Sequence, residues 1–498
     1  MRQDSTQAEG SVVLASGSAA GGTGQPESSV LLPNIAPLGA RLNVARPRIA
    51  LGPAAGRIAL ASSAFAVLLV VLFATARPSP LVPHSGIAFP GWEAGPLHGL
   101  LGALVKSNTA ISLGFSVVLA LMLLAYGAAV LAVRTLSMRA IVIWVLAIHA
   151  ILLMSPPLQL TDLFNYLGYA RLGGVHHLNP YTHGMGVEFH DPVFRFTTWH
   201  HLRSPYGYLF TAITYPIAML PMPVAYWVLK VLTVLLSLTF IWLVWKCARL
   251  LGRDPRFAVL FVAANPVYLI YAVGGFHNDF FMLVPSTAAI ALLLSRRDRS
   301  AGAAVMLAVF VKFTAVLLLP FLLIAARPAE RRLRVLTGAV LATIPLAMLS
   351  FALFGLTVPN LQDQSTLLTD YSIPNLVGIV LHVGGGTPLL LRLANVALVV
   401  TVLFFLRRRG DWLTGAGWST LALVASLAWL VPWYVIWVLP LAALGTSIRL
   451  RRAAVAFTVF LVLAFFPATA MLMAAEHIDP MATSAGQASV ALQRKLEQ

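Results

Sequence analysis

The sequence contains little cysteine and few charged residues. Cys247 is the single cysteine among 498 residues, which excludes a disulfide framework and a cysteine-based metal site. Charged residues make up 10% of the chain, whereas soluble domains contain about 25%. Hydrophobic residues reach 59%, with a mean hydropathy of +0.84. A soluble domain of this length could not bury so much apolar surface, so the sequence predicts an all-α polytopic membrane protein.

The basic residues are distributed unevenly along this apolar chain. If the apolar segments alternate across the membrane from the first one at 57–76, 24 of the 34 basic and 7 of the 17 acidic residues share one side. That side then carries the whole net charge of +17. The positive-inside rule makes this side cytoplasmic. The charge therefore predicts a multi-pass plasma-membrane protein with a cytoplasmic N-terminus, and no nucleic-acid partner is needed to explain it.

The chain divides into three parts by composition. Residues 1–50 are rich in Gly, Ser, Ala and Pro, which predicts a disordered cytoplasmic tail. Residues 51–480 contain about thirteen apolar segments and form the predicted membrane domain. Residues 481–498 are expected to be a short outer tail.

The longest polar insertion on the predicted outer side is 159–205, which holds six of the twelve histidines. The following stretch, 206–222, is apolar enough to span the membrane. A span there would invert the arginine pattern downstream, so we expect a helix lying at the outer membrane surface. The outer loop 159–222 is therefore the first place to look for polar chemistry.

Asp162 directly follows the third apolar segment. A carboxylate at the end of an apolar helix is partly desolvated, which suits a general base. The alternative is that Thr161 or Asp162 caps the next helix. On that helix Tyr166 shares a face with Asp162, although it could simply anchor the membrane interface. Arg171 is a nearby cation that lies off this face.

Lys312 lies between two short apolar segments, 300–311 and 313–325, which we expect to form a V that turns near the outer surface. A lone lysine there is costly and is a functional candidate, able to hold a lipid phosphate. It could also snorkel to headgroups. Lys230, inside the fourth span, invites the same argument more weakly.

Two further motifs place polar or aromatic groups at the predicted outer boundary. His277, Asn278 and Asp279 in GGFHNDFF could bind a sugar, a phosphate or a cation, or could cap two helices. Trp433 and Tyr434 in PWYVIW could stack on a sugar ring or a prenyl chain, or belong to an aromatic belt. The loop histidines lack a chelating spacing, and no nucleotide-binding fingerprint occurs.

Five motifs occur in an order that carries a family resemblance over roughly residues 140–446. They are TDLFNYLGYARL with LNPY (Asn179–Tyr181), SPYG around Tyr206, GGFHNDFFM, VKFTAVLLLP and PWYVIWVLPL. Together they resemble the GT-C glycosyltransferases that use polyprenyl-phosphate sugars. The chain looks most like the actinobacterial polyprenol-phosphomannose-dependent α-(1→6)-mannosyltransferases and glycosyltransferase family 87.

This resemblance implies a GT-C-type bundle of about 13 transmembrane helices with a large outer loop carrying surface helices. It also implies an inverting transfer of a hexose, with mannose favoured, from a polyprenyl phosphate to a glycan or glycolipid hydroxyl outside the cytoplasm. Asp162 matches the catalytic aspartate of the family. The candidates for binding the donor phosphate and sugar are Lys312, Arg171, His277, Asn278, Asp279, Tyr166, Asn179, Tyr181, Tyr206, Lys230, Trp433 and Tyr434.

Many GT-C enzymes carry a paired acidic motif where this chain has the single carboxylate of Thr-Asp-Leu. We therefore expect no metal and no other cofactor. The partners implied are the lipid-linked donor, the acceptor and membrane lipid. Three alternatives stay open at this point: a transporter or flippase of a lipid-linked saccharide, a GT-C enzyme using arabinose or glucose, and a non-catalytic scaffold.

Overall fold

The computed structural model describes residues 51–82, 89–101, 107–359, 365–408 and 410–498. The predicted tail, 1–50, lies outside the described residues. The described part is helical and contains no named strand. The all-α prediction is therefore confirmed, as expected for a chain whose apolar segments must satisfy their own backbone hydrogen bonds.

Five helices are long and apolar enough to cross a membrane by themselves. They are α1 (Pro53–Ala76), α3 (Asn108–Leu131), α7 (Met222–Leu250), α12 (Ala329–Phe354) and α15 (Pro388–Arg407). Two bent pairs could each form one broken span: α8 (Pro255–Ala263) with η4 (Val267–Val273), and α18 (Ile448–Ala464) with α19 (Pro467–Ala475). Each pair bends by 56°. The described residues thus contain five to seven candidate spans, and the predicted count of about 13 is not confirmed.

The difference arises because several predicted spans form helices shorter than the bilayer core, which needs about 20 residues. These are α4 (Met138–Leu153), α9 (Asp279–Leu294), α10 (Asp298–Val311), α11 (Leu318–Ala325), α16 (Trp412–Ser426) and α17 (Leu439–Leu444). One helix break falls within the predicted V-shaped pair, and another lies between two predicted spans further along the chain, 414–431 and 433–446. Lys312 has extended backbone angles between α10 and the 3₁₀ turn η5 (Phe313–Leu317), and η6 (Pro432–Trp437) separates α16 from α17.

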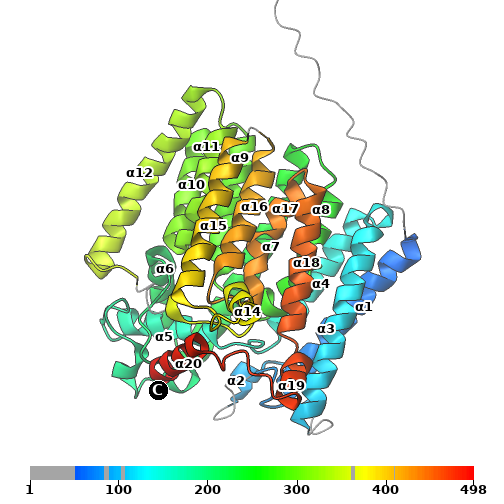
Figure 1. The fold of residues 1–498 in the computed structure, drawn as a ribbon, viewed down its shortest axis with the longest axis vertical. Helices are drawn as coiled ribbons and strands as arrows, with labels where there is room; N and C mark the ends of the chain where they lie inside the picture. Colours follow the sequence, from blue (N-terminus) through cyan, green and yellow to red (C-terminus); the bar gives the residue numbers. More distant parts are fainter. Residues whose placement is uncertain (1–50, 83–88, 102–106, 360–364, 409) are drawn as a thin grey trace, which may run out of the picture. The chain divides into compact units, whose positions relative to one another are not determined.

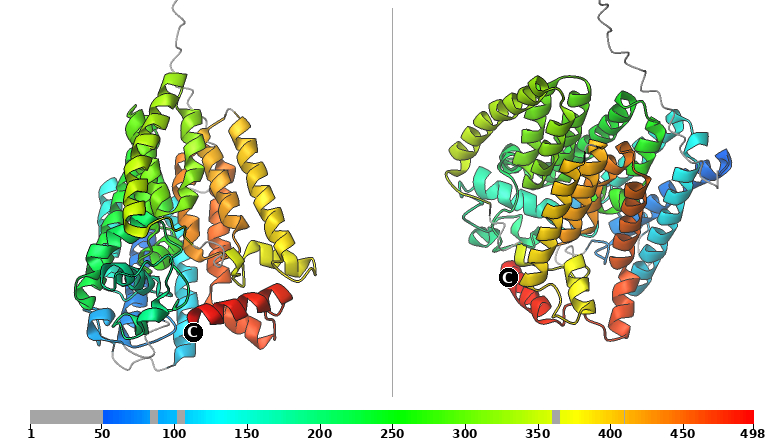
Figure 2. Two further views of the ribbon diagram at one scale, coloured as in Figure 1. Left: turned by 90° about the vertical axis from the view of Figure 1, so that its left-hand side faces the viewer. Right: turned by 45° about the horizontal axis from the view of Figure 1, so that its top comes forward.

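Within the unit formed by residues 49–498, many of the longer helices run side by side, and shorter elements gather at one end (Figures 1 and 2). The shorter elements include α5 (Asp162–Gly174), α14 (Ile373–Val380) and α20 (Ser484–Glu497). With 11 residues, α6 (Tyr208–Ala218) is about 16 Å long and too short to span. This length agrees with a surface position for 206–222. The segment expected to be a short tail, 481–498, instead contains the helix α20.

The basic loops contact one another away from this end. Arg256 donates to the carbonyl of Arg134 at 3.3 Å, and Arg253 lies 3.9 Å from the Asp411 carboxylate. Arg331 pairs with Asp298 at 2.6 Å. Each contact joins segments that the sequence placed on the same side of the membrane, so the predicted alternation agrees with these tertiary contacts.

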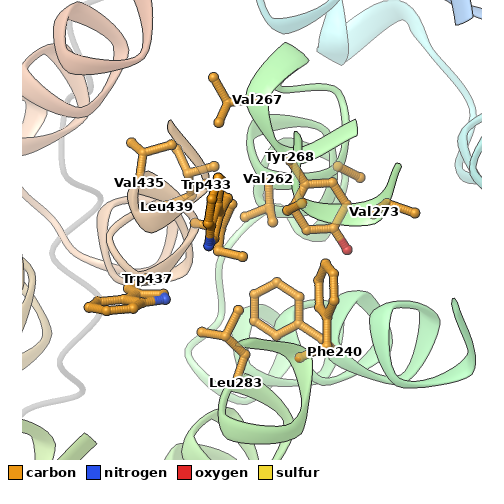
Figure 3. Packing of buried hydrophobic residues seen from close by; sticks show 14 of the residues in the cluster. Phe240, Val262, Val267, Tyr268, Val273, Leu283, Trp433, Val435, Trp437 and Leu439 are labelled. Atoms are coloured by element: carbon orange, nitrogen blue, oxygen red, sulfur yellow. The ribbon is translucent and has the colours of Figure 1, made fainter. Parts of the chain in front are cut away.

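The main core lies where α7, α8, α9, η4 and η6 meet. Figure 3 shows Trp433 of η6 facing Tyr268 of η4, with Trp437 on the other side of Trp433 and with Phe240 and Leu283 close by. These side chains are buried. Burying such aromatic rings fixes η6 against η4, and the polar residues that flank both elements meet at the edge of this core.

Candidate active site

Asp162 is the first residue of α5. The preceding Thr161 makes no side-chain cap of this helix, and its hydroxyl contacts that of Thr198 instead. The Asp162 Oδ2 atom lies 3.3 Å from Nδ1 of His277, and the carboxylate side chain is 19% exposed. The Thr161 capping alternative therefore finds no support. Asp162 points toward the GGFHNDFF motif while keeping access to solvent.

The glycine pair before His277 brings this motif close to Asp162. The amide of Leu158 donates to the carbonyl of Gly274 at 2.9 Å, which ties the segment before Asp162 to the turn before His277. A Cβ on Gly275 would lie 2.4 Å from the Tyr271 carbonyl oxygen and 2.6 Å from His277 Nε2. Only glycine fits such a close approach. The GG dipeptide is thus required by the local packing of the site.

His277 is held between α5 and η6. Its ring stacks on Trp433 with centroids 3.8 Å apart and an interplanar angle of 14°, and its side chain is 1% exposed. Its Nδ1 atom lies 3.4 Å from the Tyr166 hydroxyl, which accepts a hydrogen bond from the Asn278 amide at 3.2 Å. Burial raises the pKa of this Tyr166 hydroxyl well above its ordinary value, and the neighbouring Asp162 charge adds to the shift. The tyrosine therefore stays neutral and can serve as a donor.

Asp279 and Lys312 form an ion pair next to this stack. Lys312 Nζ lies 2.8 Å from Asp279 Oδ1, and the indole N–H of Trp437 donates to the same oxygen at 2.6 Å. The ammonium also lies 4.8 Å from the ring centroids of both Tyr434 and Trp437. An ammonium has three N–H donors. Asp279 takes one of them, so Lys312, still 20% exposed, keeps donors for a ligand.

Three buried polar atoms of the HND motif have no hydrogen-bond partner within the described residues. They are His277 Nε2, Asn278 Nδ2 and Asp279 Oδ2. Buried polar groups are nearly always hydrogen-bonded in folded proteins. Unpartnered polar atoms on three consecutive residues make this turn a candidate for binding a polar ligand or water.

The structure places Arg171 elsewhere. Its Nε donates to both carboxylate oxygens of Asp191, at 2.8 and 2.9 Å, and its Nη1 donates to the Ala218 carbonyl at 3.1 Å. His176 contacts the same carboxylate at 2.7 Å. Although burial opposes ionisation, these hydrogen bonds hold the Asp191 pKa below its ordinary value. Arg171 therefore holds the loop together. The sequence alone did not identify Asp191 as its partner.

Three other candidate residues donate hydrogen bonds to backbone carbonyls and so stabilise the fold around the site. Asn179 donates to the Phe354 carbonyl at 2.8 Å, and the Tyr181 hydroxyl donates to the Tyr206 carbonyl at 3.0 Å. Lys230 has no exposed surface, because its Nζ donates to the Ser155 carbonyl at 2.7 Å and lies 3.9 Å above the Trp227 ring. A lysine buried this way does not reach a ligand at the Asp162 site.

Tyr206 packs against Tyr166, with the two ring centroids 5.0 Å apart, and forms part of the support behind the site.

Trp437 belongs to the site but was missed by the sequence analysis. The sequence feature that could have indicated Trp437 is its spacing of three residues from Tyr434, because residues three apart lie on the same side of a 3₁₀ turn. Asp162, Tyr166, His277, Asn278, Asp279, Lys312, Trp433 and Tyr434 are thus the predicted residues that the structure brings together.

The site has one exposed carboxylate, one ammonium and an aromatic wall. Among the described residues, no group of three or more His, Cys, Asp or Glu side chains is arranged to hold a metal ion. The expectation that the chain works without a metal remains a prediction. The arrangement can accept a proton at Asp162 and place a positive charge near a bound anion at Lys312.

Two family models match the chain. The model described as alpha-(1->6)-mannopyranosyltransferase, N-terminal domain, matches residues 86–328, and the one described as MptB C-terminal domain matches residues 376–493. The two matches together cover most of the chain, although neither alone covers half of it, and the chain is thus similar to the family that these models describe. The resemblance inferred from the sequence motifs is thereby confirmed.

Two curated relatives are similar to the chain. Alpha-(1->6)-mannopyranosyltransferase A of Mycobacterium tuberculosis is 28% identical over 358 residues, which cover 64% of this chain and 66% of the relative. The protein of the same name from Corynebacterium glutamicum is 28% identical over 180 residues, 34% of this chain and 35% of the relative. The chain thus spans just under two thirds of the first and about a third of the second. No solved structure matches the chain.

Proposed function

We propose that this chain is an inverting mannosyltransferase. It transfers mannose from a polyprenyl-phosphate donor to a hydroxyl of a glycan or glycolipid on the extracytoplasmic face of the plasma membrane. The observation that carries the proposal is the convergence of Asp162, the HND turn and Lys312. A base, three open hydrogen-bonding positions and a cation come together from distant parts of the sequence. The similarity to this family supports mannose as the sugar.

Asp162 acts as the general base. As the acceptor oxygen attacks the anomeric carbon, the Asp162 carboxylate takes its proton, and the bond from that carbon to the phosphate oxygen breaks. The contact with His277 fixes the direction of the carboxylate, since one oxygen faces the buried imidazole. The partial exposure of Asp162 leaves room for an acceptor to approach.

Lys312 stabilises the phosphate as it leaves. The leaving group gains a negative charge when the sugar–phosphate bond breaks, and a fixed cation lowers the energy of that state. Asp279 and Trp437 fix the position of the ammonium, and the remaining N–H donors of Lys312 meet the phosphate. The open Nε2 of His277 and Nδ2 of Asn278 can bind the sugar or phosphate oxygens.

A lipid-linked donor fits the surroundings of Lys312. A cavity of about 60 Å³ lies beside Trp437, between α9, η5 and α17. Most of its lining is apolar, including Met282, Leu318 and Leu441. Trp437 lines this cavity and its ring centroid lies 4.8 Å from the Lys312 ammonium, so the mostly apolar cavity is placed to take the prenyl chain of a donor whose phosphate binds Lys312. The aromatic wall of Trp433 and Tyr434 offers a stacking surface for the sugar.

The experiment that tests the function is a transfer assay. Washed membranes that contain the protein receive radiolabelled polyprenyl-phosphate mannose and a mannan acceptor. We expect labelled glycan with the wild type and about 10²-fold less, or lower still, with Asp162→Asn at equal protein levels. Movement of labelled lipid across sealed vesicles without transfer to the acceptor would instead indicate a flippase.

The predicted side of the membrane can be tested separately. Cys247 is buried, so the wild type offers little background for thiol labelling. Val187→Cys in the loop after α5 should react with an impermeant thiol reagent in intact cells, because Val187 is 51% exposed. Ser300→Cys, in the basic region near Asp298, should react only after lysis. The reverse pattern would place the site in the cytoplasm.

A further inference from the structure

The C-terminal helix α20 lies against two segments that lead to opposite walls of the candidate site. Leu492 and Leu496 of α20 pack with Trp199 and Leu202 of the loop after α5, and with Leu367 and Trp429. We call these six residues the clasp cluster. It touches the main core through Trp429, and it joins parts of the chain that are almost 300 residues apart in sequence.

Hydrogen bonds fix both contacts of α20. The amide of His201 donates to the Leu496 carbonyl at 2.9 Å, and the amide of Leu368 donates to the Ser489 hydroxyl at 2.7 Å. Ser489 is 2% exposed. Because a buried hydroxyl facing an amide is costly to separate from it, α20 is bound to each segment by a polar contact as well as by apolar packing.

The first segment leads directly to Asp162. The amides of Thr198 and Trp199 both donate to the Asn165 side-chain oxygen, at 3.0 and 3.3 Å. The hydroxyls of Thr198 and Thr161 are also in contact. Asn165 is 2% exposed and lies one turn after Asp162. The position of the loop around Trp199 therefore sets the position of the first turn of α5 and of its carboxylate.

The second segment leads to Trp433. The Thr369 hydroxyl donates to the Leu430 carbonyl at 2.9 Å, and the Thr369 amide donates to the Ala428 carbonyl at 3.1 Å. The chain enters η6 two residues after Leu430, and Trp433 there stacks on His277. The two walls also meet directly, since the rings of Trp199 and Trp429 are 5.8 Å apart.

We propose that α20 acts as a clasp whose residues Leu496 and Ser489 are positioning residues for the reaction. The clasp holds the Asp162 loop at a fixed distance from the His277–Trp433 stack. This inference rests on the proposed transferase function for its kinetic consequence. The helix reaches Asp162 through the loop after α5, whereas Asp279 and Lys312 are held by Trp437 at the far end of η6. Loss of the clasp should therefore disturb the base more than the phosphate site.

The test compares two substitutions on one helix in the full-length protein. Leu496→Asp places a charge in the buried clasp cluster, whereas Ala491→Asp places the same charge on the exposed face of α20. With Leu496→Asp we expect kcat to fall by about 10²-fold, since small displacements of a base have effects of this size. The donor KM should stay within about twofold of the wild type. Ala491→Asp and Leu496→Met should behave as the wild type.

A second measurement does not depend on activity. Amide hydrogen exchange should accelerate in Leu496→Asp at both 197–204 and 367–370, with the long helices unchanged. Acceleration in one segment alone, or accelerated exchange with an undiminished kcat, would overturn the clasp. An equal loss in kcat and donor affinity would also overturn it, because that pattern indicates general disruption. A wild type without transfer activity would refute the proposed function, while the exchange data would still decide whether α20 holds both segments.

Discussion

The end of the molecule that holds α5 contains two carboxylate–histidine contacts that differ in what surrounds them. Asp191 has a side chain with no exposed surface and accepts hydrogen bonds from Arg171, His176 and the Val193 amide. Asp162 lies 3.3 Å from His277, is 19% exposed, and adjoins a turn with three unpartnered polar atoms. The same residue types therefore build a closed structural cluster in one place and an open site in the other. The Asp191 cluster and the Asp162 site differ in whether polar atoms remain available to bind a ligand.

The largest expected effect is that of Asp162→Asn. The amide keeps the size of the carboxylate and its contact with His277, but it cannot accept a proton at working pH. Transfer should fall by about 10²–10⁴-fold, the usual value of general-base assistance. The purified variant should keep its membrane level and thermal stability. An undiminished turnover in this variant would show that Asp162 is not the general base. Asp162 would then have a structural role, as Asp191 does.

Removing Lys312 should have the next largest effect, and the structure separates its two roles. Lys312→Ala leaves the buried Asp279 charge without its partner, so it should lose both stability and donor use. The double variant Asp279→Asn with Lys312→Met removes both charges and should recover stability. It should not recover donor use. Thermal unfolding and the donor KM check this, and a wild-type KM in the folded double variant would contradict the phosphate role.

Arg171→Ala should mainly affect stability. It leaves the Asp191 carboxylate buried with fewer partners, which costs about 3 kcal/mol when one member of a buried pair is lost. The turnover of the folded fraction should stay near that of the wild type. Thermal unfolding together with activity per folded molecule measures both quantities. A large loss of donor affinity at unchanged stability would move Arg171 back into the site.

The smallest effect concerns acid stability. The Asp191 pKa lies below its ordinary value of 3.8. Its contribution to stability is therefore fully present above that value and is lost as the pH falls through the lower folded-state pKa. Asp191→Asn should be less stable than the wild type at neutral pH, and the gap should narrow as the pH falls below about 4. Melting temperatures across this range test the sign.

The sequence by itself determined the class of protein. Low charge and recurrent apolar segments required helices in a membrane, and the basic residues predicted which loops share a side. The order and spacing of the motifs indicated the family. Polar groups between apolar segments are costly unless they have a function, which drew attention to Asp162, His277, Asp279 and Lys312. These inferences need only composition and local pattern, which a sequence carries directly.

Only the tertiary structure decided which of these candidates meet. Arg171, Asn179 and Lys230 have the same chemical types as the site residues, but partners distant in sequence engage each of them. Trp437 and the helix α20 were missed because their roles depend on packing between segments more than 150 residues apart. Long-range contacts have no period along the chain, so the division between an open site and a closed cluster becomes visible only once the chain is folded.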